Sequence, residues 1–269
     1  MSEIMLDVKD VHKAFNPGTI NEKIALDGVN LTLEKGDFVT VIGGNGAGKS
    51  TMLNAIAGVW PIDSGSIEIG GTNVTGLPAY KRASLIGRVF QDPMTGTAAT
   101  MQIEENMALA LRRGKARSPF KPGVTHKERD RFREQLKILD LGLEDRLTAK
   151  VGLLSGGQRQ ALTLLMATLQ MPKILLLDEH TAALDPKTAE KVLAATEKVV
   201  SKDKLTTLMI THNMKDAIAH GNRLIMMNEG KVILDIRGEE KAKLTVEDLL
   251  HKFSSVSGEE FASDKVLLS

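Results

Sequence analysis

The strongest constraint on the fold is a glycine-rich segment that directly follows an apolar run. The run, residues 38–42, has the composition of a buried strand and stops at a glycine. The segment consists of Gly43, Gly44, Asn45, Gly46, Ala47, Gly48, Lys49, Ser50 and Thr51. After it, apolar residues recur at helical spacing as far as Gly58, which predicts a helix that ends there. Strand, glycine loop and helix in this order predict a phosphate-binding loop.

The residues of this loop suit the phosphates of a nucleotide. Glycines let successive backbone N–H groups point at phosphate oxygens, and Lys49 supplies a positive charge to the β and γ phosphates. The hydroxyl of Ser50 is a ligand for Mg²⁺. The alternative, a flexible glycine turn without function, is disfavoured by the predicted strand and helix on either side of the loop.

A second apolar run, residues 174–177, ends in the carboxylates Asp178 and Glu179. Functional residues of open α/β sheets gather at the carboxyl ends of strands. Adjacent strand residues point to opposite sides, so we expect Asp178 to hold Mg²⁺ and Glu179 to polarise an attacking water. An ordinary strand end that meets solvent is the alternative. The phosphate loop in the same chain favours the catalytic interpretation.

Two further features belong to the same chemistry. Ser155, Gly156, Gly157 and Gln158 precede the apolar residues 161–169, which predicts a capped helix whose first N–H groups can receive an anion. His212 follows a predicted strand at residues 207–210. A lone histidine is more often packed in a core, but its place directly after a strand favours a site. The whole set predicts a protein that binds ATP and hydrolyses it as a dimer.

The distribution of apolar residues indicates how the chain is organised. Short strands are expected within residues 1–42, including 4–8 and 29–33, and again at 62–70 after a turn at 64–66. Helical patterns dominate residues 98–170, and strands return at 174–177, 207–210 and 224–227 with helical stretches between the first of these, which predicts a parallel sheet. Thr245 is expected to cap a last helix, whose apolar stripe consists of Val246, Leu249, Leu250 and Phe253.

Composition excludes several classes of protein. The formal charge is +1, from 35 basic and 34 acidic residues, which argues against a dedicated nucleic-acid binder. There is no cysteine, so disulfides and thiolate metal sites are excluded. Residues 1–10 are too polar for a signal peptide, and no run of about 18 apolar residues is present. We expect a soluble chain that reaches a membrane only through a partner.

On these motifs the chain resembles the nucleotide-binding subunits of ABC-type ATPases, over roughly residues 4–240. The resemblance implies an α/β fold: a P-loop NTPase (RecA-like) parallel-sheet core, an N-terminal antiparallel β-subdomain and an inserted α-helical subdomain. The expected ATPase domain covers residues 1–240, with its core at 1–92 and 165–240 and the helical insertion at about 93–164. A C-terminal helix and tail would occupy residues 241–269.

The resemblance also implies roles for individual residues. Phe15 would stack on adenine, and Gln91 would sense Mg²⁺ and water. Asp185 would lie in a loop that communicates across the dimer. Residues 155–158 would contact the γ-phosphate held by the opposite subunit, and His212 would contact the γ-phosphate within its own. The expected ligands are therefore ATP and Mg²⁺, with Ser50, Gln91 and Asp178 at the metal.

Three departures from the family pattern are present. His180 stands where a proline usually follows the catalytic glutamate, and Gly44 replaces a stiffer residue. The helix after Arg159 lacks the arginines that many members carry, because residues 161–166 are nearly all apolar. None of these departures removes a group that performs chemistry, so we expect a competent site.

Residues 15–22, 87–94 and 178–185 resemble bacterial importer ATPases associated with amino acids, including aromatic ones, and more distantly branched-chain amino-acid systems. The resemblance implies a head-to-tail, ATP-dependent homodimer, although a heterodimer stays open. It also implies integral membrane permease subunits, an extracytoplasmic substrate-binding protein and a peripheral position at the cytoplasmic face of the cell membrane. The alternative is an ABC ATPase without a transport role, in lipoprotein release, cell-wall remodelling, or work on ribosomes or DNA.

The most basic stretch, residues 112–133, is open to two interpretations. It could face anionic lipid headgroups beside a permease, or form a solvated loop and helix face in which Glu128 and Asp130 are interspersed. The second is favoured.

Overall fold

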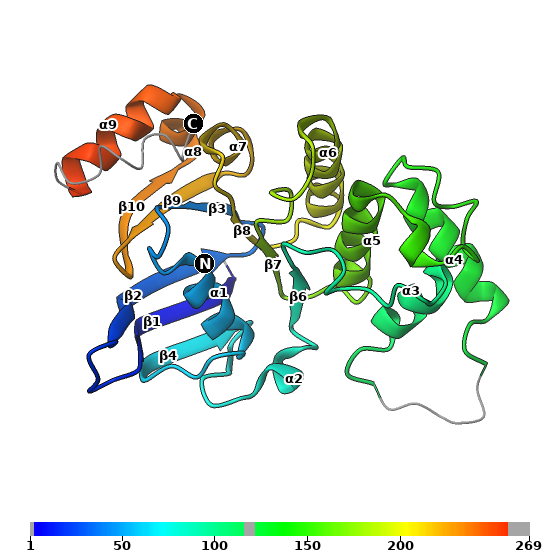
Figure 1. The fold of residues 1–269 in the computed structure, drawn as a ribbon, viewed down its shortest axis with the longest axis horizontal. Coiled ribbons are helices and arrows are strands. Elements are labelled where there is room, and N and C mark those ends of the chain that lie inside the picture. The colour runs from blue at the N-terminus through cyan, green and yellow to red at the C-terminus, as the bar shows by residue number, and fades with distance from the viewer. Residues whose placement is uncertain (1–2, 116–121, 258–269) are drawn as a thin grey trace. The chain divides into compact units, whose positions relative to one another are not determined.

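The computed structural model describes residues 3–115 and 122–257, which divide into two compact units. The first unit is formed by residues 1–82 and 206–269, and the second by residues 83–205 (Figure 1). Arg117 and Lys121 of the basic stretch, and the tail after residue 257, lie outside the described residues.

An antiparallel sheet in the first unit has the strand order β2-β1-β4-β5. The strands are β1 (Ile4–Phe15), β2 (Lys23–Glu34), β4 (Ser64–Ile69) and β5 (Thr72–Asn73). The predicted strands at 4–8 and 29–33 are present, but β1 and β2 each extend over 12 residues. Register shifts interrupt their pairing, and these irregularities let one strand continue past residues that break the apolar alternation.

The turn predicted at residues 64–66 is wrong, because these residues begin β4. Gly65 has φ +92°, and a Cβ there would lie 2.3 Å from the carbonyl oxygen of Asp10 in β1. The register between β1 and β4 shifts at this point. The glycine therefore serves a close approach of two strands at an irregularity, and not a chain reversal.

The remaining strands of the first unit are mainly parallel. They are β3 (Phe38–Ile42), β8 (Thr207–Ile210), β9 (Arg223–Asn228) and β10 (Lys231–Arg237). β3 pairs in parallel with β8 and with β9, as the apolar runs predicted, and all five residues of β3 are buried. β10 was not predicted. It forms an antiparallel hairpin with β9 through Glu229 and Gly230, which both have positive φ as a tight two-residue turn requires.

Helices of the first unit are α1 (Lys49–Ala57), α2 (Ala79–Arg82), α7 (Met214–Ala219), α8 (Gly238–Ala242) and α9 (Val246–Ser257). α1 ends at Gly58 with φ +74°, as predicted. The predicted cap of α9 is also confirmed, since Thr245 and Asp248 exchange hydrogen bonds. Leu249 and Phe253 belong to a buried cluster with residues of β3, α7 and β9. The C-terminal helix therefore packs on the first unit.

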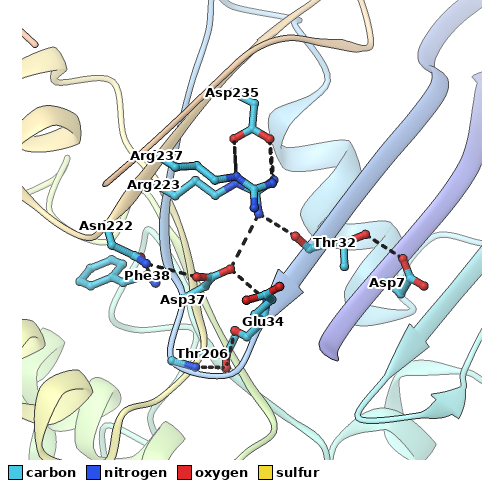
Figure 2. A network of polar contacts seen from close by, with 11 residues as sticks. Asp7, Thr32, Glu34, Asp37, Phe38, Thr206, Asn222, Arg223, Asp235 and Arg237 are labelled. Atoms are coloured by element: carbon cyan, nitrogen blue, oxygen red, sulfur yellow. Dashed lines mark hydrogen bonds and ion pairs between the residues drawn. The ribbon is translucent and has the colours of Figure 1, made fainter. Parts of the chain in front are cut away.

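A buried arginine connects strands of the first unit (Figure 2). Arg223 in β9 is 3% exposed and donates to both carboxylate oxygens of Asp235 in β10, at 2.7 and 2.6 Å. Its third nitrogen donates to the carbonyl oxygen of Thr32 in β2 at 2.6 Å and lies 3.8 Å from Asp37. One guanidinium thus joins the antiparallel sheet to the strands beside β3.

The second unit combines a pair of parallel strands with several helices. β6 (Ile86–Val89) pairs in parallel with β7 (Ile174–Asp178). The helices are α3 (Ile103–Leu111), α4 (His126–Lys137), α5 (Gly156–Thr168) and α6 (Pro186–Asp203), with a 3₁₀ turn at Val151–Leu153. The helical character predicted for residues 98–170 is confirmed. α4 begins earlier than its apolar pattern indicated, because Thr125 and Glu128 form a capping box before the first apolar residue.

Cations of the basic stretch mostly bond within the second unit. Arg129 binds the buried carboxylate of Glu104 through two nitrogens, at 2.6 and 2.8 Å, and Arg112 pairs with Glu128. Arg113 and Arg131 donate to backbone carbonyl groups of the α5 end. Burial lowers the pKa of Arg113. Lys115, Lys127, Arg131 and Arg133 are exposed, as a solvated loop and helix face requires, and Arg133 pairs with Asp130. Several arginines of the stretch also connect helices of this unit.

Candidate nucleotide site

The phosphate loop lies between the buried strand β3 and the helix α1, in the order the sequence predicted. Gly43, Gly46 and Gly48 have φ of 150°, 78° and 101°, which side chains rarely adopt. A Cβ at Gly43 would lie 2.2 Å from the carbonyl oxygen of Met227, and one at Gly48 would lie 2.5 Å from that of Ala25. Both glycines are therefore required by the backbone, whatever the loop binds.

Helix α1 begins without a side-chain cap. Its N-cap residue, Gly48, makes no side-chain hydrogen bond, and the first turn contains no acidic residue. The N–H groups of a helix's first turn have no partner within the helix, and the helix dipole places positive potential there. This end of α1 therefore suits an anion.

The side chain of Lys49 is hydrogen-bonded to the backbone of the phosphate loop. This side chain is buried, with 5% exposed, and Nζ donates to the carbonyl oxygens of Gly43 at 2.6 Å and Gly44 at 3.0 Å. The ammonium is thereby fixed beside the N-terminus of α1. Two positive features, the lysine charge and the helix end, converge on one loop.

His212 lies at the same sheet edge as the phosphate loop. β3 and β8 pair in parallel, with Val41 opposite Ile210, and the N–H of Thr211 donates to Val41 at 3.1 Å. The chains leave the sheet together at this point, towards Gly43 on one strand and His212 on the other. The side chain of Asn213 accepts from two N–H groups of α7 and fixes the turn after the histidine. The structure therefore brings His212 and the loop to one edge, as predicted.

Phe15 ends β1, and its ring meets the ring of Trp60 edge to face. The centroids are 5.1 Å apart and the planes form an angle of 83°. Nζ of Lys13 lies 5.7 Å from the centre of the Phe15 ring. Both aromatic rings are partly exposed, so a planar base can reach this cluster.

In the second unit, Gln91 and Glu179 follow paired strands at equivalent positions. Val89 of β6 is opposite Leu177 of β7 in the parallel register, and each functional residue lies two positions after its strand's member of that pair. Gln91 is exposed, whereas Asp178 and Glu179 are half-buried. The amide and the two carboxylates therefore share one edge of this strand pair. The sequence predicted the strand before Asp178, whereas the strand before Gln91 was not predicted.

Arg88 was missed by the sequence analysis. Its Nη2 lies 3.3 Å from Oδ2 of Asp178, and its guanidinium lies 4.6 Å from the centre of the Phe90 ring. Burial lowers the pKa of Arg88, and the charge of Asp178 opposes that shift. A charged residue within a short apolar segment was the only local signal, and the pairing of β6 with β7 that brings Arg88 to Asp178 is not visible in the sequence.

The turn after β7 is stabilised by one hydrogen bond within the turn and by one to helix α6. Glu179 has φ +47°, a left-handed conformation that costs a residue with a side chain about 1–2 kcal/mol. The N–H of Ala182 donates to the Glu179 carbonyl oxygen at 3.0 Å. His180, 2% exposed, places Nε2 3.1 Å from the hydroxyl of Thr196 in α6. The residue noted only as a departure from the family pattern is thus an internal contact of this turn.

Ser155 caps the N-terminus of α5, as predicted. Its Oγ accepts from the N–H of Gln158 at 3.3 Å, and the Gln158 side chain accepts from the N–H of Ser155 at 3.2 Å. Ser155 and Gly156 are exposed, while Gly157 is buried. A Cβ at Gly157 would lie 2.1 Å from Cγ2 of Thr188 in α6. The second glycine is therefore needed for helix packing, and the first leaves the helix end open.

Asp185 caps α6. Its carboxylate accepts from the N–H of Thr188 at 3.1 Å, and hydrogen bonds from Thr188 lower the pKa of Asp185.

Gln160, one turn into α5, is fully buried and donates from Nε2 to the carbonyl oxygen of Phe90 at 2.9 Å. This bond ties the residue before Gln91 to the helix that Ser155 begins, and no pattern in the sequence indicated it.

The oxygen donors at these positions suit Mg²⁺. In the first unit, Ser50 is exposed on the first turn of α1. In the second unit, the side chains of Gln91 and Asp178 provide amide and carboxylate oxygens. Mg²⁺ prefers oxygen ligands and commonly takes only one or two from protein beside phosphate oxygens and water. Within residues 3–115 and 122–257, no group of three His, Cys, Asp or Glu side chains is gathered for a metal.

Comparison with known proteins agrees with these features. Residues 26–182 match the ABC transporter family. The chain is 46% identical over 254 residues to a tyrosine transport ATP-binding protein of Clostridioides difficile, which covers 93% of this chain and 98% of the relative. It is 36% identical over 237 residues to a methionine import ATP-binding protein of Rhizobium johnstonii, covering 86% of this chain but 60% of that protein.

Solved structures show the same fold. A dimeric ATP-binding cassette in a post-hydrolysis state with ADP and Pi aligns with a TM-score of 0.73 at 32% identity, over 87% of this chain and 98% of that one. A nucleotide-free cassette from an ABC transporter aligns with a TM-score of 0.76 at 26% identity, over 96% of this chain. The predicted α/β fold class is confirmed. The chain is an ATPase that belongs to the ABC transporter family.

Proposed function

We propose that this chain powers a bacterial importer of amino acids, with tyrosine or a similar aromatic amino acid as the first candidate. The observation that carries the proposal is the 46% identity to a tyrosine transport ATP-binding protein along nearly the whole of both chains. The methionine and the spermidine/putrescine import ATP-binding proteins are less similar, at 36% and 33%, and this chain spans only 60% and 57% of their lengths.

The proposed hydrolysis assigns one task to each group. Phe15 stacks on adenine, and Lys49 with the N–H groups of residues 43–51 neutralises the phosphates. Glu179 polarises the attacking water, and Gln91 and His212 orient the water and the γ-phosphate. Ser50, Gln91 and Asp178 would hold Mg²⁺, which would supply positive charge to the phosphates when bound. The fixed ammonium of Lys49 and the open end of α1 support this assignment.

A head-to-tail homodimer completes the proposed site. The exposed Ser155 and Gly156 at the start of α5 would meet the γ-phosphate bound by a second copy of the chain, with Gly157 and Gln158 shaping that helix end. Asp185 would lie in the loop that transmits the state of one site to the other. Hydrolysis would then open the dimer, and this motion would drive the permease subunits.

The proposed partners are suggested by the similarity to ATP-binding proteins of importers. Within the part of the chain that the structure describes, no helix combines the length and apolarity needed to cross a bilayer. We propose integral membrane permease subunits, docked on the helical insertion at about 93–164 beside Gln91, and an extracytoplasmic substrate-binding protein. The ATPase domain proposed for residues 1–240 would sit peripherally at the cytoplasmic face, without a nucleic-acid partner.

Affinity capture of Glu179→Gln protein tests this proposal. The substitution keeps the shape of the side chain and removes its charge, so the ATP-closed complex should accumulate. The tagged variant is purified from native membranes with Mg-ATP, and its partners are identified by mass spectrometry. A multi-span permease and a binding lipoprotein would support the importer. Ribosomal proteins, DNA-repair factors or a cell-wall complex without a permease would contradict it.

The cargo is tested separately, with the captured subunits in proteoliposomes. Uptake of labelled tyrosine should depend on internal ATP and on the binding protein, and unlabelled tyrosine should compete better than methionine or spermidine. ATP-dependent uptake that tyrosine does not inhibit would contradict the cargo assignment and leave the transport function intact.

A further inference from the structure

We propose that His180 is a positioning residue for ATP hydrolysis: its imidazole ties the turn that carries Glu179 to Thr196 in the middle of α6. The inference rests on the proposed role of Glu179 as the residue that polarises the attacking water. It adds a connection that the motifs do not contain.

The direction of the hydrogen bond follows from its surroundings. The hydroxyl of Thr196 donates to the carbonyl oxygen of Val192 at 2.8 Å. A hydroxyl has one hydrogen, so its remaining capacity towards His180 is as an acceptor. Nε2 of His180 therefore carries the hydrogen and donates at 3.1 Å. The contact has one orientation, set by the helix backbone.

Because both side chains are buried, this hydrogen bond is difficult to replace by one to water. His180 is 2% exposed and Thr196 is 1% exposed, so water cannot replace either partner easily. A buried polar group that loses its partner is left at a cost greater than the bond itself contributes. The imidazole is thus confined to one place, and its backbone with it.

The backbone of His180 directly follows Glu179, the residue proposed to polarise the attacking water. Glu179 has φ +47°, a conformation that persists in a residue with a side chain only where neighbouring contacts enforce it. β7 fixes the chain up to Asp178, and the His180 contact fixes it immediately after Glu179. We therefore expect the direction of the Glu179 side chain to depend on the histidine, because one peptide unit joins them.

The test uses Thr196, since valine matches threonine in shape and lacks the hydroxyl. Thr196→Val should lower kcat for ATP hydrolysis at saturating ATP by about tenfold, and change KM by less than twofold, because the phosphate loop is untouched. Thr196→Ser keeps the hydroxyl and should retain kcat within twofold of wild type. A merely structural role would move the melting temperature without this division between kcat and KM.

Thr168→Val provides a matched control. Thr168 is also a buried helix threonine, and its hydroxyl donates to the backbone carbonyl groups of Leu164 and Leu165. The control therefore removes a similar internal hydrogen bond from α5 without touching the turn after β7. Its melting temperature should fall about as far as that of Thr196→Val, while its kcat stays at the wild-type value.

The measurements distinguish a failure of the proposed role of Glu179 from a failure of the positioning role of His180. If Glu179→Gln retains wild-type hydrolysis, the role of Glu179 itself is wrong. If Glu179→Gln is inactive but Thr196→Val matches the Thr168→Val kcat, or if Thr196→Ser loses as much as Thr196→Val, the positioning role is overturned. Should Thr196→Val not fold, His180→Phe, which keeps a ring and removes the donor, is measured in its place, and an unchanged kcat there overturns the inference equally.

Discussion

The carboxylate of Asp235 receives two parallel hydrogen bonds from the guanidinium of Arg223, at 2.7 and 2.6 Å (Figure 2). Although burial opposes it, these bonds and those from Arg237 hold the pKa of Asp235 below its usual range. Arg223 also donates to Thr32 of β2, so the pair joins three strands through one buried group. This connection holds β2 of the antiparallel sheet to the hairpin of β9 and β10.

Arg223→Lys should lower the free energy of unfolding by about 1–2 kcal/mol, because a lysine keeps the charge but cannot form the parallel pair or reach Thr32 at the same time. Arg237→Lys is the matched control. Arg237 binds the same carboxylate but its side chain is 56% exposed, so the loss should be no more than about 0.5 kcal/mol. Urea denaturation measures both, and equal losses would contradict the bridging role.

The fluorescence of Trp60 should report ATP binding. It is the only tryptophan in the chain, and its ring is 5.1 Å from that of Phe15, so a base stacked on Phe15 should alter its emission. Phe15→Leu should weaken ATP binding about tenfold, since stacking on an aromatic contributes about 1–3 kcal/mol per base. Titration by calorimetry checks the affinity independently. Ile20→Ala, at a fully exposed apolar position, should leave it unchanged.

The two glycines at the start of α5 should differ in their effect on stability. Gly157→Ala places a Cβ 2.1 Å from Thr188 and should cost about 1–3 kcal/mol, because α5 and α6 must separate. Gly156→Ala meets only the end of the Leu184 side chain, at 3.3 Å, which can move. Its melting temperature should stay close to wild type. If Gly157→Ala unfolds at the same temperature as Gly156→Ala, the packing argument is wrong.

Lys241 should make stability rise with pH. Burial lowers the pKa of Lys241 to about 8, below the 10.5 that applies when the chain is unfolded. Between these values the unfolded state binds more protons, so the free energy of unfolding increases as pH rises, by at most about 1.4 kcal/mol per pH unit. Below pH 8 the cost of the buried charge is present in full.

Comparison with Lys241→Met isolates this contribution. Urea denaturation at pH 7.5, 8.5 and 9.5 should show the wild type gaining stability relative to the variant over this interval. A difference that is constant with pH would mean that the ammonium does not titrate there. The side chain donates to the carbonyl oxygens of His220 and Gly221, so the neutral amine retains hydrogen-bond partners.

The sequence predicted the parts of the fold that local chemistry determines. Gly43 and Gly48 are required by backbone contacts that no side chain permits, and Ser155 and Thr245 each satisfy N–H groups of their own helix. Such features depend on the types of a few residues that are close together in the sequence. The loop after β3, the two caps and the carboxyl ends of β3, β7 and β8 therefore agree with the sequence, whereas the extents of β1 and β2 do not.

Contacts between distant segments could not be predicted. Arg88 and Asp178 are 90 positions apart, and His180 meets Thr196 only because the chain reverses from β7 into α6. The hairpin of β9 and β10 turns on Glu229 and Gly230, a pair without the asparagine or aspartate that usually indicates such a turn. Gly65 was misread for the same reason, since its close approach to Asp10 depends on the neighbouring strand.

The composite site of two subunits is tested most directly by ATP-dependent dimerisation of Glu179→Gln, measured by light scattering with and without Gly156→Asp. Asp at the first position of α5 suits the helix dipole, so the fold should stay stable, but its charge would repel the partner's γ-phosphate. We expect Glu179→Gln to dimerise with ATP, and the double variant to bind ATP, as reported by Trp60, yet to stay monomeric. Dimers of equal stability in both proteins would contradict the account.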